Sequence, residues 1–186
     1  MVNTKKYVPH QISEVAKEFQ EVTSASGASL KNFRVSDYAL EFDLFSDNAE
    51  SKVLALQLIS SRLGTIQSER DLTKEPTLRN KEVVIAEAVN LFNEQRYWEC
   101  HEVLESIWRV ESAADEKSLQ QGVILAASSL VHAQKGEDVV CFDMVGRALG
   151  KLEVWSSEKY YSLNVHSLKS YLKSLLETKR IFFRIL

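Results

Sequence analysis

The spacing of hydrophobic residues changes several times within the first 72 residues. In QISEVAKEFQEV, apolar side chains recur three and four positions apart, which predicts a helix with one buried face. In FRVSDYALEFDLF they recur every second position on either side of Ser36 and Asp37, which predicts a β-hairpin with one buried face. Helical spacing returns between Val53 and Leu63, and Gly64 ends it.

Two weaker patterns flank these elements. TKKYVP near the N-terminus has the composition of a short first strand, and TIQSERDL that of a last one. The order strand, helix, strand, strand, helix, strand is the ferredoxin-like pattern, a two-layer sandwich. We therefore expect residues 1–72 to form an α+β module. No catalytic cluster stands out in it, so we expect a packing or dimerising role.

The strand pattern disappears after this module. Pro76 and the charges around it predict a linker at residues 73–79. Helical patterns follow at about 77–93, 96–110, 115–135, 138–156 and 164–183, separated by short polar or glycine-containing joints. Five helices with brief connections predict an all-α antiparallel bundle over residues 80–186.

Composition narrows the class of protein. The 186 residues are 45% hydrophobic and 26% charged, values typical of a soluble globular chain. A net charge of −3 disfavours a nucleic-acid partner, because such partners select a basic excess. No apolar run approaches the roughly 20 residues that span a bilayer, and the N-terminal lysine pair precedes no apolar segment. We expect a cytoplasmic protein that does not contact membranes.

The segment RYWECHEVLESIWR, residues 96–109, carries the strongest chemical signal. Around a helix, one broad side is apolar: Tyr97, Cys100, Val103, Leu104 and Ile107, with Trp108 at its edge. The other side is aromatic and ionisable: Trp98, His101, Glu102, Glu105 and Arg109. We expect such a helix to be contacted on both sides. Cys100 and Cys141 fall within apolar helical patterns, which predicts two reduced, packed thiols.

The helix at 115–135 offers a matching polar stripe. The stripe consists of residues spaced four, three and four positions apart, Gln121, Leu125, Ser128 and His132. Gly122 and the small residues after Ile124 allow a neighbouring helix to approach closely. The simplest packing places Gln121 and His132 against the polar side of the central helix, in one half-buried polar cluster.

The two segments LFNEQRYWECHEVLESIWR and LQQGVILAASSLVHAQKG resemble the helical-bundle family catalogued as domain of unknown function 309. The resemblance covers about residues 80–180, and Glu99 to Arg109 is its specific part. Gln95 stands where the family usually has glycine, and Glu137 where it usually has asparagine, so the turns beside the two key helices are expected to differ. The resemblance implies a bundle with a pocket and no established reaction.

Several chemistries are compatible with these residues. HEVLE resembles the HExxH motif of zinc proteases with Glu105 in place of the second histidine. His101, Glu105 and His132 would be the ligands of a divalent metal ion. Two potential ligands one helical turn apart are common by chance, so no cofactor is predicted. His101 oriented by Glu105 has the parts of a general base for hydrolysis. No convincing nucleophile and no glycine-rich phosphate loop is present, so enzymatic activity stays open.

Two functions remain as hypotheses. In the first, a pocket between the helices of His101 and His132 binds a small polar or anionic ligand. His101 and Glu105 are then the reactive pair, and Glu102 belongs to the same cluster. Arg109 and Gln121 orient the ligand, and Trp98 and Trp108 form the walls. In the alternative, the protein is a structural or interaction scaffold whose polar cluster only fixes the packing of helices. In either case we expect a homodimer.

Overall fold

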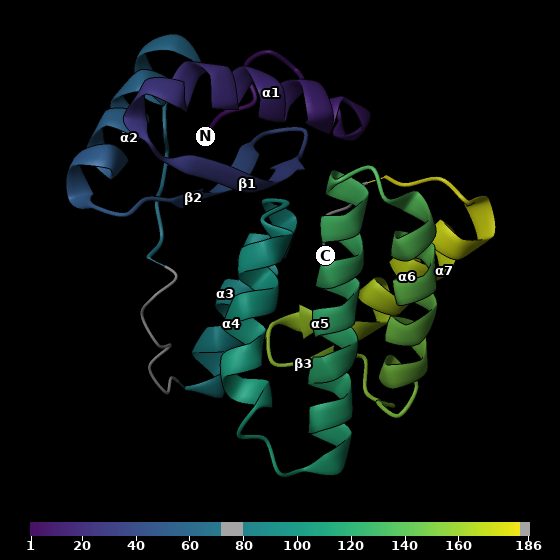
Figure 1. Cartoon of the computed structure of the whole chain (residues 1–186). Coiled ribbons are helices and arrows are strands. Elements are labelled where there is room, and N and C mark those ends of the chain that lie inside the picture. The colour runs from purple at the N-terminus through teal and green to yellow at the C-terminus, as the bar shows by residue number, and fades with distance from the viewer. Residues whose placement is uncertain (72–79, 183–186) are drawn as a thin grey trace. The chain divides into compact units, whose positions relative to one another are not determined.

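A computed structural model describes residues 1–71 and 80–182 of the chain (Figure 1). The predicted linker at 73–79 lies outside these residues. Contacts between residues group the chain into two compact units. The first comprises Met1–Thr73 with Gln134–Gly136, and the second comprises Lys74–Ala133 with Glu137–Leu186. No described helix has the length and apolar character needed to cross a membrane.

The N-terminal unit is a β-hairpin packed on a helix. Its elements are η1 (Pro9–Gln11), α1 (Ile12–Thr23), η2 (Ser24–Ser26), β1 (Ser29–Val35), β2 (Leu40–Phe45) and α2 (Ala49–Arg62). The two strands pair antiparallel, and Val35 lies opposite Leu40 next to the turn. The helix at α1 and the hairpin around residues 36–37 are thus confirmed.

Aromatic and aliphatic side chains from α1 and the hairpin form the core of this unit. Val15 and Phe19 of α1 are fully buried, and the Phe19 ring meets that of Phe33 edge to face, with centroids 5.5 Å apart. Leu40 and Ile59 complete the centre of this cluster. The spacings therefore identified the buried positions Phe19, Phe33 and Leu40, whereas Tyr38 and Val53 on the same patterns are exposed.

The ferredoxin-like prediction is wrong, because the two outer strands do not form. Val2 makes a single isolated bridge to Ala39. The chain then turns at Asn3, whose side-chain amide donates to the backbone oxygens of Tyr7 and Ser36. Residues 65–71 form no strand, consistent with the few apolar positions in IQSERD. The unit has a two-stranded hairpin instead of a four-stranded sheet.

The second unit is the predicted antiparallel helical bundle (Figure 1). Its helices are α3 (Lys81–Asn93), α4 (Tyr97–Trp108), α5 (Ala114–Gln134), α6 (Asp138–Leu152) and α7 (Val165–Thr178). The predicted joint between the last two helices contains a small hairpin that the sequence did not reveal, β3 (Lys159–Tyr160) paired with β4 (Leu163–Asn164). Tyr160 and Leu163 of this hairpin are buried.

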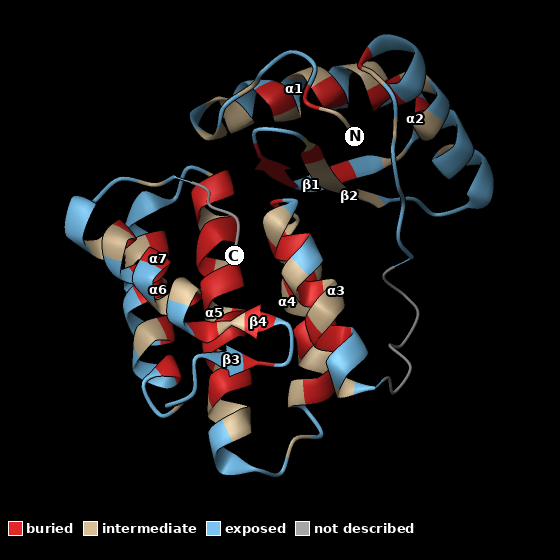
Figure 2. Cartoon of the chain, turned by 180° about the vertical axis from the view of Figure 1, so that it is seen from behind, coloured by how far each residue is buried: buried red, intermediate tan, exposed pale blue. Residues whose placement is uncertain are grey.

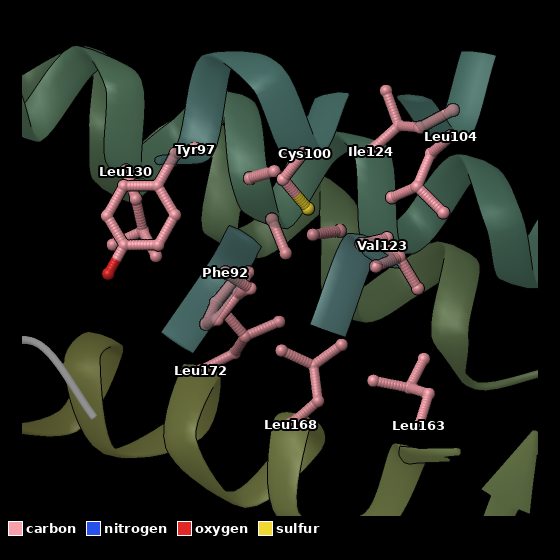
Figure 3. Packing of buried hydrophobic residues seen from close by; sticks show 14 of the residues in the cluster. Phe92, Tyr97, Cys100, Leu104, Val123, Ile124, Leu130, Leu163, Leu168 and Leu172 are labelled. Carbon is pink, nitrogen blue, oxygen red and sulfur yellow. The ribbon is translucent and has the colours of Figure 1, made fainter. Parts of the chain in front are cut away.

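All five helices contribute to one apolar core. Their buried faces point inward (Figure 2), and Phe92, Leu104, Val123 and Leu168 meet near its centre (Figure 3). Burying one side chain of this size contributes about 1.5–3 kcal/mol, so the shared core is the main source of the bundle's stability.

Gly122 marks a close approach between α5 and α6. A β-carbon at this position would come within 2.7 Å of the Leu152 side chain and 3.2 Å of the Ala148 carbonyl oxygen. Both neighbours are fully buried, so neither has free space into which to move. Glycine is therefore required here by packing, as the small-residue pattern of α5 suggested.

Replacing Gly122 with alanine tests this packing. We expect Gly122→Ala to lower the free energy of unfolding by about 1–3 kcal/mol, because the added methyl overpacks the contact with α6. Urea denaturation measures the change. Gly150→Ala is the matched control: nothing lies within 4 Å of the added methyl, so we expect no loss of stability. Equal effects of the two substitutions would contradict the steric explanation.

Candidate functional site

The turn between α3 and α4 sets the position of the candidate site. Gln95 adopts a left-handed backbone conformation with φ 60°, which glycine adopts without strain. This explains why a glycine is expected at this point. Arg96 follows, and its guanidinium donates to both carboxylate oxygens of Glu99 at 2.8 Å and to Glu94 at 2.9 Å. These contacts fix the first turn of α4.

The two sides of α4 are those that the spacing predicted. Tyr97, Cys100, Val103, Leu104 and Ile107 are buried in the bundle core. Burial strongly raises the pKa of the Cys100 thiol, and it raises the pKa of Cys141 to about 11. Both cysteines are free and buried, so they remain protonated packing residues, as expected.

His101 is the centre of the polar side of α4. Its ring stacks on that of Trp98, with centroids 5.3 Å apart and planes 24° from parallel. Nδ1 lies 3.3 Å from Glu102 Oε1, and Nε2 lies 3.3 Å from Glu105 Oε1. The His101 side chain is 17% exposed. The imidazole is therefore enclosed by one indole and two carboxylates of its own helix.

Glu105 connects His101 to the end of the helix. Its second oxygen pairs with the Arg109 guanidinium one turn further along. The Arg109 side chain is 65% exposed, whereas that of Glu105 is 25% exposed. The structure thus brings together Trp98, His101, Glu102, Glu105 and Arg109. We refer to these five residues as the α4 cluster.

The predicted partners from α5 do not make polar contacts with the α4 cluster. His132 pairs through Nδ1 with Glu137 at the turn into α6. Gln121 is half-buried and makes no hydrogen bond with any described residue. Among residues 1–71 and 80–182, no group of three His, Cys, Asp or Glu side chains is placed to hold a metal ion. The metal site of His101, Glu105 and His132 is therefore not assembled.

Trp108 faces a different set of residues. Its ring lies beneath the Lys117 ammonium, 5.6 Å from the centroid, and Lys117 Nζ also donates to the Glu111 carbonyl oxygen at 3.0 Å. The Trp108 indole nitrogen is buried without a hydrogen-bond acceptor in the described part of the chain. The polar contact described for Trp108 is therefore with Lys117, near the start of α5.

A second polar group, which the sequence did not reveal, closes into a ring of hydrogen bonds. Lys81 Nζ lies 2.6 Å from Glu111 Oε2 and 2.7 Å from Glu116 Oε2. Gln120 Nε2 donates to Glu111 Oε2 at 3.1 Å and to Tyr160 Oη at 2.9 Å. Tyr160 Oη donates to Glu116 Oε2 at 2.6 Å, which completes the circuit. We call these five residues the polar ring.

The polar ring joins four separate segments of the bundle. Lys81 begins α3, Glu111 belongs to the loop between α4 and α5, Glu116 and Gln120 belong to α5, and Tyr160 to β3. Although Glu111 lies in a loop, its side chain is only 6% exposed. No local spacing marks the ring, because its members come from distant parts of the sequence.

Charge pairing perturbs both carboxylates of the ring. The hydrogen bond from Lys81, helped by the backbone N–H of Ala113, lowers the pKa of Glu111 from 4.5 to about 2. The hydrogen bonds from Lys81 and Tyr160 also lower the pKa of Glu116. Burial and the contact with Glu116 raise the pKa of Tyr160. The ring is thus a network of ionised carboxylates and neutral donors around one lysine.

A narrow pocket in the bundle is apolar and separate from both polar groups. It is lined by Ile85, Ala88, Val89, Phe92, Cys100, Leu104, Val123 and Leu163. Figure 3 shows the Cys100 sulfur directed toward this region of the core. None of the α4 cluster contributes to the lining, so the polar side of α4 is a surface and not the wall of this pocket.

Part of the bundle matches a known family. Residues 85–141 match the family described as "Domain of unknown function (DUF309)". This segment contains α4 and α5. The resemblance expected from the sequence is therefore confirmed.

One curated relative matches almost the whole chain. It is an "Uncharacterized protein" of Aquifex aeolicus (strain VF5), 25% identical over 174 residues. The match covers 92% of this chain and 45% of the relative, so the chain spans less than half of the relative's length. No solved structure matches significantly.

The polar ring predicts how stability depends on pH. A carboxyl with a lower pKa in the folded state stabilises the fold above its unfolded-state pKa, and the contribution disappears as the pH falls through the folded-state value. For Glu111 this window runs from about pH 4.5 down to about 2, and Glu116 shifts in the same direction. We expect the free energy of unfolding to fall across this window.

Glu111→Gln isolates the contribution of the ring. We expect a loss of about 1–3 kcal/mol at pH 7, because Lys81 loses its more buried partner. Below pH 4.5 the stability of the variant should fall less steeply than that of the wild type. Urea denaturation between pH 7 and 2.5 measures both. Glu177→Gln, which removes an exposed carboxyl, is the control, and parallel curves for Glu111→Gln and wild type would contradict the prediction.

Proposed function

We propose that the helical bundle binds a small polar ligand on the surface formed by the α4 cluster. The supporting observation concerns which elements the polar contacts of the cluster connect. Among the described residues, the ion pairs of His101, Glu102, Glu105 and Arg109 all stay within α4 and its C-terminal cap. They join α4 to no other helix or strand, whereas the polar ring connects four segments. These four polar side chains therefore lack the packing role that the scaffold alternative requires.

The charges of the cluster indicate the chemistry of the ligand. Two carboxylates flank His101, and the one guanidinium nearby already pairs with Glu105. Acceptor oxygens therefore outnumber available donors. This arrangement favours a ligand that donates hydrogen bonds, such as a small amine, over the anionic ligand that was also expected.

The geometry favours binding over hydrolysis. Each ring nitrogen of His101 lies 3.3 Å from a carboxylate oxygen, and Nδ1 is buried without a hydrogen bond in the described part of the chain. A general base must instead present a lone pair to the substrate, within about 2.6–3.2 Å of the proton it removes. One of the two glutamates would have to move before His101 could act in this way. We therefore propose a binding module and not a hydrolase.

Stability measurements distinguish the scaffold alternative from the ligand-binding proposal. For a surface cluster within one helix we expect His101→Ala and Glu105→Ala each to change the free energy of unfolding by less than about 1 kcal/mol. A buried pair that fixes packing would cost about 3–5 kcal/mol when broken. Urea denaturation of both variants beside Glu111→Gln makes the comparison. A loss at Glu105 as large as that at Glu111 would support the scaffold.

Ligand binding is tested directly on the full chain. We expect small diamines to shift the backbone amide NMR signals of residues 98–105 in a saturable titration, because the carboxylates of α4 accept from ammonium groups. Matched dicarboxylates should cause no such shift. Glu105→Gln should raise the Kd for the diamine at least tenfold, and Glu177→Gln should leave this Kd unchanged. Diamine shifts that persist in Glu105→Gln would contradict the proposed surface.

A further inference from the structure

The outward side of α6 carries residues that the packing of the described chain does not explain. Cys141, Val145, Ala148 and Leu152 face the core. The opposite side is a nearly straight line of exposed positions, Val139, Asp143, Gly146 and Gly150, continued past the helix end by Val154. We call these five residues the α6 stripe.

Two glycines on the exposed side of α6, Gly146 near its middle and Gly150 in its last turn, need a reason. Glycine is the weakest helix former after proline. At Gly122 the structure supplies the reason, because a β-carbon there would collide with Leu152. At Gly146 and Gly150 nothing lies within 4 Å of an added β-carbon, and neither has a positive φ. The contacts within the chain therefore account for the first glycine and not for the other two.

The two valines and Asp143 of the stripe, and Arg147 beside it, are also without partners in the described part of the chain. Val139 is 84% exposed and Val154 is 50% exposed. Asp143 and Arg147 lie one helical turn apart, a spacing that normally allows an ion pair. Neither forms an ion pair or hydrogen bond with any residue of the described chain. Both charges therefore remain available to another molecule.

The stripe is complementary to itself when reversed. If two copies of α6 lie antiparallel with a two-fold axis between Gly146 and Arg147, Val139 of one copy is opposite Val154 of the other. Asp143 is opposite Gly150 in the same alignment. Arg147 lies about 4.5 Å along the axis from Asp143 of the second copy, within reach of its carboxylate. The glycines at the crossing allow the two backbones to approach closely.

We propose that the α6 stripe binds a second copy of this chain, forming an antiparallel α6–α6 homodimer. A two-fold interface places the same patch on both subunits, which is the property that the stripe shows. A single helix pair buries less than the roughly 1,600 Å² of a standard interface. We therefore expect a Kd in the micromolar range.

Sedimentation velocity of the full chain over a range of micromolar concentrations tests the proposal. We expect a monomer–dimer equilibrium whose Kd rises at least tenfold in Gly146→Leu, because the larger side chain separates the helices. Ser170→Leu adds the same side chain at an exposed position of α7 and should leave the Kd unchanged. Circular dichroism confirms that both variants fold.

Charge exchange keeps the test independent of folding defects. Asp143→Arg and Arg147→Asp should each weaken self-association, because each homodimer then opposes like charges. An equal mixture of the two variants should form a heterodimer, because both ion pairs are restored. A wild-type chain that stays monomeric at every concentration would overturn the proposal. So would the finding that another part of the chain covers the stripe. A dimer whose Kd is unchanged by all these substitutions would also overturn the proposal.

Discussion

The closed polar ring of Lys81, Glu111, Gln120, Tyr160 and Glu116 is the constraint around which the helical bundle is organised. Apolar burial brings the five helices together, but burial is not directional and tolerates sliding of one helix along another. The ring is directional, since each of its links has a defined donor and acceptor. It joins the start of α3, the loop before α5, α5 itself and the β3 strand, and so fixes their register. The ion pairs of His101, Glu102, Glu105 and Arg109 join no such segments among the described residues.

The sequence predicted the elements whose evidence is local. The helical period of α4 identified its five buried residues, and the period-two pattern identified the hairpin around Ser36. The outer strands of the ferredoxin-like sheet were inferred from short segments with weak β-propensity, and neither formed. The polar ring had no local signature, because Lys81 and Tyr160 are 35 and 44 positions from Glu116. Tertiary contacts alone bring them together.

The same distinction explains the candidate site. His101 and Glu105 are one helical turn apart, so their contact followed from helix geometry once α4 was recognised. His132 required knowledge of how α5 faces α4. Glu137, which stands where the related family usually has asparagine, provides a carboxylate across the turn into α6, and His132 pairs with it. A local partner thus replaced the distant one that the stripe on α5 had suggested.

The two surfaces proposed for recognition share a physical property. In each case the chain carries groups that cost stability and that its own packing does not require. Gly122 is explained by Leu152, whereas Gly146 and Gly150 have empty space before them. The carboxylates of the polar ring are explained by the segments that they join, whereas the carboxylates beside His101 pair, among the described residues, only with His101 and Arg109. Weak helix formers and clustered charges lower the stability of the fold when no internal contact compensates for them. We therefore expect the compensating contacts to come from other molecules. At α4 this is a ligand that donates hydrogen bonds, and at α6 it is a second copy of the chain.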